Sequence, residues 1–368
     1  MTHALSMLSC RNLHWQIHGN TIIQDLSLDL PEGEVYCIVG PSGSGKSSLL
    51  RLIAGLDNPQ RGQITIDQHL ITDGNKALPP EKRRLNMVFQ DYALWPHMTV
   101  TNIVGYGLHT WPAASRQRRI NEMLTLMQIS EYAHRRPAQL SGGQAQRVAI
   151  ARALATDPQI LLFDEPLSNL DVQLRAQMRS EFSKLFSRLK KTVIYVTHDP
   201  LEACAFANKI VVMRAGNIEQ IATPAELFRH PKSPWVASLA GFDGEVSVRL
   251  VTQIDRQSAC IELGGKQFVV RIGRLHLSRP GQNVLLLFAP GAIHHDATDT
   301  MGITARVMGT LFEGRHWRLH VVTTVGDRHF SIIHATDLPL GSMLSLRITG
   351  LNCLIFDEGM PFPGEVVL

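Results

Sequence analysis

Three long apolar runs dominate the hydrophobic pattern of the N-terminal half of the chain. They are VYCIVG at 35–40, QILLFDEP at 159–166 and TVIYVTHD at 192–199. A helical pattern follows the first run, and another fills residues 172–189 between the other two. Strands buried on both faces carry such continuous runs, and their alternation with helices predicts a parallel sheet covered on both sides. Ligands bind such sheets at the carboxyl ends of the strands.

Other parts of this half show different periods. Residues 21–30 alternate polar and apolar side chains, which predicts a half-exposed strand. KIVVMRAGNIEQ at 209–220 predicts a further strand, and PAELFRH at 224–230 predicts a short helix. Between about 91 and 158 a helical pattern predominates, so we expect a helical subdomain to be inserted there.

Beyond about residue 240 the pattern changes to short apolar or alternating runs separated by glycine and proline turns. Runs of this spacing indicate a small all-β barrel, and two similar barrel halves remain an alternative. The segment PKSP at 231–234 marks the change. We therefore expect an α/β domain over residues 1–237 and a β-barrel domain over residues 238–368.

Composition and charge narrow the classes of protein. The 368 residues carry a formal net charge of +4 with scattered basic residues, so no nucleic-acid partner is expected. The five cysteines are dispersed without CxxC spacing, which supports neither a zinc site nor a disulfide framework and fits a reducing cytoplasm. No window approaches the ~18 uncharged apolar residues that a spanning helix needs. Any membrane contact would therefore come through a partner.

A glycine-rich motif lies where the first apolar run meets its helix. GPSGSGKS at 40–47 fits the phosphate-loop pattern GxxxxGK[ST] between a strand and a helix. Its glycines let backbone N–H groups surround phosphates, Lys46 places a positive charge at the β and γ phosphates, and Ser47 offers a hydroxyl to Mg²⁺. The second run ends in Asp164, a carboxylate for the metal, and Glu165, which can polarise a water for attack on the γ phosphate.

A second, incomplete phosphate motif lies a hundred residues further on. LSGGQAQR at 140–147 places Gly142 and Gly143 at the start of a helical run. Glycines at a helix start leave N–H groups free at its positive end, which suits phosphate, but no lysine accompanies them. An alternative is that the two glycines only allow close packing of the helix start.

Together with Gln90 in VFQDYALWPH and His198 in YVTHD, these motifs closely resemble those of the ATP-binding-cassette (ABC) ATPases over about residues 5–235. The resemblance implies that Gln90, with Ser47 and Asp164, holds Mg²⁺, that Glu165 is the general base, and that His198 contacts the γ phosphate. It implies that these residues bind ATP: Trp15, Gly40, Pro41, Ser42, Gly43, Ser44, Gly45, Lys46, Ser47, Ser48, Ser141, Gly142, Gly143 and Gln144. For Trp15, stacking on adenine competes with a role in the core.

Members of this family work as head-to-tail dimers, in which each ATP lies between the phosphate loop of one copy and the LSGGQ loop of the other. The resemblance therefore implies a homodimer that hydrolyses ATP and is peripheral to the cytoplasmic face of the inner membrane. Separate permease subunits would dock at residues 90–98, on Tyr92, Leu94, Trp95, Pro96 and Met98. A periplasmic or extracellular solute-binding protein would act indirectly, through the permease.

The C-terminal β region favours an importer, because similar barrels follow the ATPase domains of importers for ferric iron, polyamines, sugars and oxyanions. Ferric iron is the first choice of cargo, and polyamines, sugars and oxyanions are the alternatives. A soluble ABC ATPase that acts on ribosomes or DNA is a different class. Such proteins generally carry two cassettes in one chain or a long coiled-coil insertion, and this sequence has neither.

Overall fold

The computed structural model describes residues 6–74, 76–274, 279–289, 291–295 and 302–358. Its internal contacts divide the chain into two compact units, residues 1–224 and residues 225–368. The boundary expected from sequence, after residue 237, lies inside the second unit. The reason is that Ala237 and Ala240 belong to an apolar cluster of that unit, together with Leu285 and Leu287.

An antiparallel sheet opens the first unit, in the order β2-β1-β4-β5. Its strands are β1 (Ser6–Ile17), β2 (Asn20–Pro31), β4 (Arg61–Ile66) and β5 (His69–Thr72). The predicted half-exposed strand is confirmed, because β2 buries Leu26, Leu28 and Leu30 and exposes the residues between them. Of these four strands, only β2 was predicted from the hydrophobic pattern.

The second sheet of this unit has six strands in the order β10-β9-β3-β8-β7-β6. They are β3 (Val35–Val39), β6 (Leu85–Val88), β7 (Ile160–Asp164), β8 (Thr192–Thr197), β9 (Lys209–Arg214) and β10 (Asn217–Ala222). The pairs from β9 to β6 are all parallel, and every residue of β3 and β8 is buried. The predicted parallel sheet is confirmed, with the three apolar runs at its centre.

The prediction of a single strand over residues 209–220 is wrong. The chain turns back at Ala215 and Gly216, whose φ angles are 45° and 77°, and β9 and β10 pair as an antiparallel hairpin. Two consecutive residues with positive φ form a tight turn that matches the twist of the two strands. In the sequence, the local sign of this turn is Gly216, which follows Ala215.

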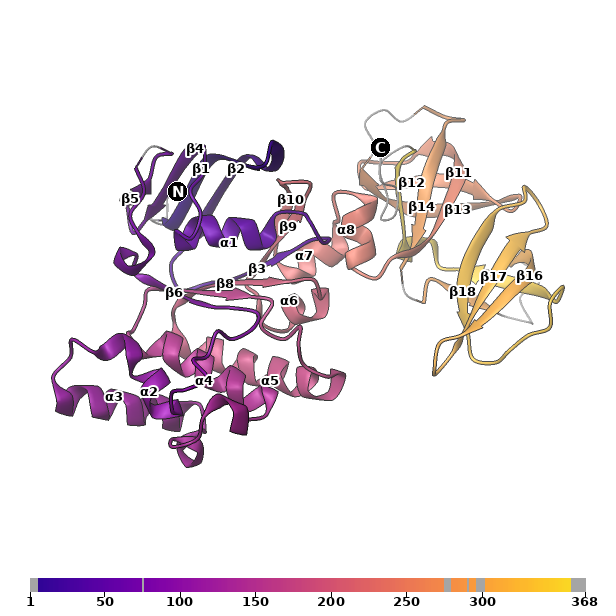
Figure 1. Cartoon of the computed structure of the whole chain (residues 1–368). Coiled ribbons are helices and arrows are strands. Elements are labelled where there is room, and N and C mark those ends of the chain that lie inside the picture. The colour runs from indigo at the N-terminus through magenta and orange to yellow at the C-terminus, as the bar shows by residue number, and fades with distance from the viewer. Residues whose placement is uncertain (1–5, 75, 275–278, 290, 296–301, 359–368) are drawn as a thin grey trace. The chain divides into compact units, whose positions relative to one another are not determined.

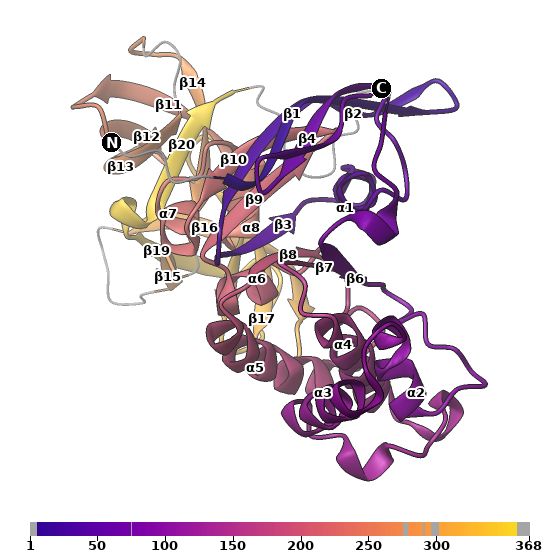
Figure 2. The same ribbon diagram turned by 90° about the vertical axis from the view of Figure 1, so that its left-hand side faces the viewer.

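Helices cover both faces of the six-stranded sheet. Helix α1 (Lys46–Ala54) lies between the two sheets, and the other helices lie on the opposite side (Figures 1 and 2). These are α2 (Val100–Val104), α3 (Ala113–Leu126), α4 (Gly142–Ala155), α5 (Val172–Leu189) and α6 (Pro200–Phe206), with 3₁₀ turns at Pro80–Lys82, Tyr106–Leu108, Ser130–Tyr132 and Pro137–Gln139. The predicted helix over 172–189 is confirmed by α5. One apolar cluster, which includes Ile23, Leu50 and Leu162, joins the sheets through α1.

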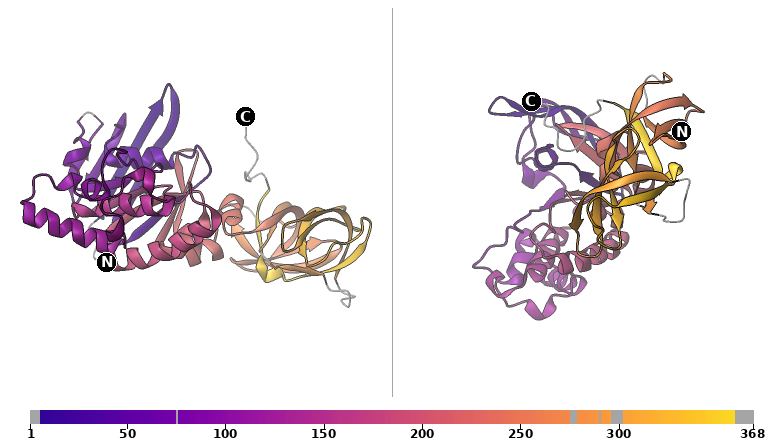
Figure 3. Two further views of the ribbon diagram at one scale, coloured as in Figure 1. Left: turned by 60° about the horizontal axis from the view of Figure 1, so that its bottom comes forward. Right: turned by 90° about the vertical axis from the view of Figure 1, so that its right-hand side faces the viewer.

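The second unit begins with two short helices, α7 (Pro224–Arg229) and α8 (Pro234–Leu239), and continues in strands, which Figure 3 shows in orange to yellow. The closed barrel β11-β12-β13-β20-β14 comprises β11 (Asp243–Gln253), β12 (Ser258–Leu263), β13 (Lys266–Arg274), β14 (Asn283–Phe288) and β20 (Cys353–Asp357). The sheet β15-β19-β16-β17-β18 comprises β15 (Ile293–His295), β16 (Ile303–Phe312), β17 (Trp317–Thr323), β18 (His329–His334) and β19 (Met343–Ile348), and a 3₁₀ turn at Gly350–Asn352 leads into β20.

The all-β character expected for this region is confirmed, and a second sheet accompanies the closed barrel. A shared apolar cluster that includes Val248, Leu286 and Leu319 joins the two. No helix among the described residues is long and apolar enough to cross a membrane.

Candidate nucleotide site

Strand register gathers the predicted catalytic residues at one edge of the six-stranded sheet. Val39 at the end of β3 pairs with Thr197 at the end of β8, so Gly40 and His198 follow at the same level. The end of β7 pairs with β8, and Val88 of β6 pairs with Phe163 of β7. The carboxyl ends of four parallel strands therefore present Gly40, Gln90, Asp164, Glu165 and His198 side by side.

The phosphate loop is built around glycines that no other residue can replace without strain. A Cβ atom at Gly40 would lie 2.2 Å from the carbonyl oxygen of Met213, so the loop passes too close to β9 for a side chain. Gly43 and Gly45 have φ angles of 79° and 94°, which favour glycine. The loop leads directly into α1, whose free N–H groups face phosphate in loops of this type. Its geometry thus fits a nucleotide phosphate chain.

Two polar side chains of the loop are buried. Lys46 is only 5 % exposed, and its ammonium group donates hydrogen bonds of 2.9 Å to the carbonyl oxygens of Gly40 and Pro41. Burial lowers the pKa of Lys46, and the charges of Glu165 and Asp164 oppose this effect. The Ser44 hydroxyl is also buried and has no hydrogen-bond partner among the described residues. Both groups can bind phosphate oxygens without breaking a hydrogen bond to another side chain.

The residues predicted to hold the metal form a short contact. Ser47 donates a hydrogen bond of 2.7 Å from its hydroxyl to Oδ1 of Asp164. Burial raises the pKa of the Asp164 carboxyl, an effect that the Ser47 hydrogen bond opposes and the nearby Glu165 charge reinforces. A hydroxyl and a carboxylate are oxygen ligands of the kind that Mg²⁺ prefers. The pair fits Mg²⁺ chemically.

The predicted base and the predicted γ-phosphate contact lie against each other. Nδ1 of His198 is 3.1 Å from Oε2 of Glu165. Glu165 has a φ angle of 44°, unusual for a residue with a side chain, and its backbone is held by Val196, whose carbonyl accepts from the Glu165 N–H, and by the Ser168 hydroxyl. Such backbone strain is concentrated at functional sites. The turn aims this carboxylate away from the strand and toward the imidazole.

The remaining residues of this site are placed as follows. Gln90 is exposed in the turn after β6, and its backbone carbonyl accepts a hydrogen bond of 3.0 Å from the Asn169 side chain. Among the described residues, no hydrogen bond joins the Gln90 side chain to Ser47 or Asp164. Ser42 is exposed, and Ser48 is half-buried at the start of α1.

Trp15 lies in β1 opposite Ile23 and is 8 % exposed within the apolar cluster under that sheet. Packing in the core therefore accounts for most of its surface. The stacking on adenine that the resemblance implies stays a prediction.

The LSGGQ loop forms the start of α4 and is stabilised by its own serine and glutamine. The Ser141 hydroxyl accepts from the Gln144 N–H at 3.4 Å, and the Gln144 side chain accepts from the Ser141 N–H at 2.9 Å, a capping box. A Cβ at Gly142 would lie 3.2 Å from the side chain of Leu170. A Cβ at Gly143 would lie 3.4 Å from the side chain of Leu174. Close packing is thus part of what the glycines do.

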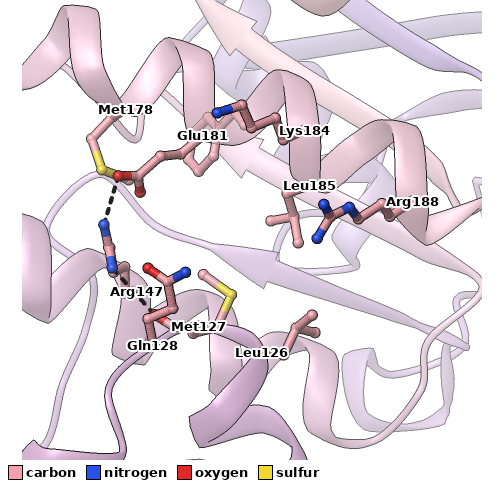
Figure 4. A pocket seen from close by; sticks show the side chains of 10 residues that line it. Leu126, Met127, Gln128, Arg147, Met178, Glu181, Lys184, Leu185 and Arg188 are labelled. Carbon is pink, nitrogen blue, oxygen red and sulfur yellow. Dashed lines mark hydrogen bonds and ion pairs between the residues drawn. The ribbon is translucent and has the colours of Figure 1, made fainter.

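The loop does not join the group around Lys46. It lines a hollow of about 410 Å³ together with residues from 128–132 and from α5, and no residue of the phosphate loop lines that hollow. A second hollow, of about 390 Å³, lies between residues 126–128 at the end of α3 and helix α5, where Arg147 of α4 forms an ion pair of 2.6 Å with Glu181 (Figure 4). The gathered site and the LSGGQ loop are therefore separate features of one chain.

Three arginines near the site were missed by the sequence analysis. Arg175 of α5 donates to the carbonyls of Ser168 and Leu170 and so holds the loop after β7. Arg51 of α1 lies near enough to Asp164 for its positive charge to oppose the rise in the pKa of that carboxyl. Arg152 of α4 holds the turn that follows Gln90. An arginine in a helix carries no local signal for a long-range contact of this kind.

Comparison with known proteins identifies the family. A model of the ABC transporter family matches residues 23–168. The Fe(3+) ions import ATP-binding protein FbpC of Rhizobium etli is 40 % identical over 347 residues, which are 91 % of this chain and 94 % of the relative. The sn-glycerol-3-phosphate import ATP-binding protein UgpC of Rhizobium meliloti is 39 % identical over 357 residues, 96 % of this chain and 94 % of the relative.

A further relative and a solved structure each match about three fifths of the chain. The spermidine/putrescine import ATP-binding protein PotA of Bacillus thuringiensis is 49 % identical over 226 residues, 61 % of this chain and 68 % of the relative. The dimeric post-hydrolysis structure of the ATP-binding cassette MJ0796 with ADP and phosphate has a TM-score of 0.52 at 32 % identity and covers 59 % of this chain and 99 % of that one. The chain therefore belongs to the ABC transporters, as an ATP-binding and ATP-hydrolysing subunit of importer type.

Proposed function

We propose that two copies of the chain form a head-to-tail dimer with two ATP sites, each made of the Lys46 group of one copy and the LSGGQ loop of the other. The observation that carries this proposal is the separation of the two half-sites within one chain. The Lys46 group offers a lysine and carboxylates, which the LSGGQ loop lacks, and the LSGGQ loop offers an exposed helix start that can face the partner. The related cassette MJ0796 is dimeric with ADP and phosphate bound, which supports the arrangement.

Within each site, hydrolysis divides into a few roles. A water attacks the γ phosphorus in line with the bond to ADP, its proton passes to the Glu165 carboxylate, and ADP departs with the electron pair of the broken P–O bond. Lys46 offsets negative charge on the phosphates, and His198, in contact with Glu165, faces the γ phosphate. Mg²⁺, held by Ser47, Asp164 and Gln90, would supply neutralisation of charge on the β and γ phosphates.

For the membrane partner, we propose docking beside the turn that follows Gln90. Met98 and Tyr106, with neighbouring residues of α2 and α3, line a hollow of about 490 Å³, and Tyr106 is 55 % exposed. Leu94, Trp95 and Met98 are half-buried and Pro96 is exposed, whereas Tyr92 is buried. A hollow of this kind, lined by polar as well as apolar side chains, suits a short amphipathic helix of a permease at the cytoplasmic face of the inner membrane. Tyr92 then supports the docking surface from below.

The composite site is tested by Ser141→Arg, because a bulky cation at the start of α4 blocks the approach of the partner copy. We expect ATP to bind the isolated monomer with unchanged affinity and hydrolysis to be lost. Equilibrium binding of a fluorescent ATP analogue and release of phosphate are the two measurements. Loss of monomer binding would instead show that Ser141 serves the fold of its own chain.

For the cargo, we propose ferric iron, which is what the FbpC relative imports by its name. Glycerol 3-phosphate and polyamines, the cargoes in the names of the UgpC and PotA relatives, are the competing outcomes. A deletion strain complemented with the chain or with its Glu165→Gln variant is tested for uptake of labelled ferric iron, glycerol 3-phosphate and spermidine. We expect the unmodified chain, but not its Glu165→Gln variant, to restore uptake of ferric iron. Restored uptake of glycerol 3-phosphate or spermidine in place of iron would overturn the assignment.

A further inference from the structure

The turn after Gln90 has an unusual backbone that side chains from other elements hold in place. Tyr92 and Ala93 have φ angles of 63° and 44°, so two consecutive residues with side chains occupy the left-handed region. Such a conformation persists only where surrounding contacts enforce it. The Asn169 side chain donates to the carbonyl of Gln90 at 3.0 Å, and Arg152 donates to the carbonyls of Tyr92 and Ala93.

Arg152 makes three contacts with this turn. Its guanidinium donates from one nitrogen to the carbonyl of Ala93 and from the other to that of Tyr92, the latter at 3.0 Å. Its Cζ atom lies 5.3 Å from the centre of the Trp95 ring, which in turn packs at 4.3 Å against the ring of Tyr106. A planar fork that donates to two carbonyls while stacking on an aromatic ring cannot be reproduced by lysine.

The position of Arg152 connects this turn to the LSGGQ loop. Arg152 lies in the last turn of α4, and the same helix begins at Ser141. Nine of the fourteen residues of α4 are buried, so the helix moves as one body. The turn beside the docking hollow and the loop that faces the partner's ATP are therefore attached to opposite ends of a single rigid element.

Anchoring of the helix end alone does not explain Arg152. Arg119 of α3 already donates to the carbonyls of Leu154 and Ala155 at 2.9 Å, which satisfies the last turn of α4. Arg152 reaches away from its own helix instead, to Tyr92 and Ala93. Burial lowers the pKa of its guanidinium, and the negative charge of Asp91 opposes this effect. A half-buried cation whose hydrogen bonds go to a loop is most simply explained by a need to hold that loop.

We propose that Arg152 is a positioning residue that makes α4 and the turn after Gln90 move together. This proposal rests on the proposed function, because the permease would act at one end of α4 and the partner's ATP at the other. A permease that shifts the turn would shift Ser141 with it, and ATP that binds the LSGGQ loop would rigidify the turn. Two ligands that bias one element are coupled reciprocally.

Hydrogen exchange in the full chain tests the coupling without a permease. The reference is the Glu165→Gln protein, in which bound ATP persists. Its hydrogen exchange is measured with and without Mg-ATP in peptides that cover residues 90–98 and 141–147. Arg152→Lys is then added to it. Arg119→Lys is the matched control, because it also alters an arginine that donates to two carbonyls, but neither lies in the turn.

In the reference and in the control, Mg-ATP is expected to slow exchange in both peptides. With Arg152→Lys, residues 141–147 keep this protection, and the protection of residues 90–98 falls by about tenfold, equivalent to ~1.4 kcal/mol and comparable to one hydrogen bond to a charged group. Unchanged protection of residues 90–98 would overturn the proposal.

Exchange in β7 (Ile160–Asp164) reports the integrity of the fold in every variant. If Arg152→Lys fails that check, Trp95→Leu decides, because it removes the stacking and leaves both hydrogen bonds: partial loss of protection at residues 90–98 supports the role, and no loss overturns it. Absence of protection at residues 141–147 in the reference would refute the composite ATP site instead, and the role of Arg152 would fall with it.

Discussion

At the scale of single residues, the site keeps charged groups in places where burial disfavours their charge. Lys46 is buried with only backbone carbonyls as hydrogen-bond acceptors, and Asp164 is held ionised against burial by the Ser47 hydroxyl and by nearby cations. Burying a charge costs free energy unless it is compensated. The full compensation for these groups is expected from the phosphates and Mg²⁺, so the burial of these charges is predicted to lower the stability of the nucleotide-free chain.

Asp164→Asn tests this cost directly. The amide oxygen can still accept from Ser47, while the buried charge and its repulsion with Glu165 are removed, so the thermal midpoint of the nucleotide-free chain should rise by about 1–3 °C at neutral pH. Because the folded-state pKa of Asp164 is raised, its destabilising charge is present above that pKa and disappears as pH falls toward the unfolded value of about 3.9. The difference between the two proteins should therefore shrink on acidification. An unchanged or lower midpoint at neutral pH would contradict this account.

Glu165→Gln tests the general base. The amide keeps the size of the side chain and its contact with His198 but accepts no proton, so we expect hydrolysis to slow by ~10²- to 10⁴-fold while ATP still binds. Steady-state release of phosphate and binding of ATP are measured on the same preparation. Near-normal turnover would remove Glu165 from this role.

At the scale of elements, α4 begins at the LSGGQ loop that the sequence indicated and ends in a contact that the sequence did not indicate. The motif indicated a helix start suited to phosphate, and the structure adds the capping box of Ser141 and Gln144. Both earlier explanations of the glycines retain support, because Gly142 packs closely on Leu170 yet belongs to an exposed loop. The far end of the helix holds the turn after Gln90 through Arg152.

A pair of substitutions separates packing from phosphate binding at Gly142. A Cβ there would press on Leu170 at 3.2 Å, and Leu170→Ala removes the obstructing methyl groups. If the partner's ATP needs this glycine, Gly142→Ala should reduce hydrolysis several-fold, and the double variant Gly142→Ala with Leu170→Ala should remain equally slow. Recovery of the rate in the double variant would show that the glycine serves packing alone. Leu170→Ala alone controls for the loss of the leucine.

At the scale of the whole molecule, every residue of the candidate site lies in the first compact unit, and the second unit has an apolar cluster of its own. A chain that ends at residue 224 should therefore still hydrolyse ATP. A chain that ends at residue 239 retains α8 but loses the barrel strands against which its apolar face packs, and should aggregate more. Hydrolysis and light scattering of the two fragments provide the comparison. Loss of all hydrolysis in the shorter fragment, with its fold intact by circular dichroism, would assign the second unit a part in the site.

The nucleotide motifs and the central sheet could be predicted from local stretches of the sequence. Phosphate loops, capping boxes and buried strands depend on neighbouring residues, so GPSGSGKS, LSGGQ and the three apolar runs could be interpreted locally. The same locality explains what was missed: strands β5 and β6 have only four residues each, and the hairpin after β9 turns within two residues. Such elements become strands through pairing partners rather than through their own pattern.

Which of these groups lie in contact could not be predicted from the sequence and follows from the packing of the chain. Parallel register placed Glu165 beside His198 and left Ser141 with a separate hollow, and the path of the chain brought Arg152 from one helix onto the carbonyls of Tyr92 and Ala93. Contacts between residues distant in the chain depend on the geometry of the whole packed unit, and no short stretch of sequence encodes them. The nucleotide chemistry was therefore local, and the connection between its two half-sites and the docking turn was not.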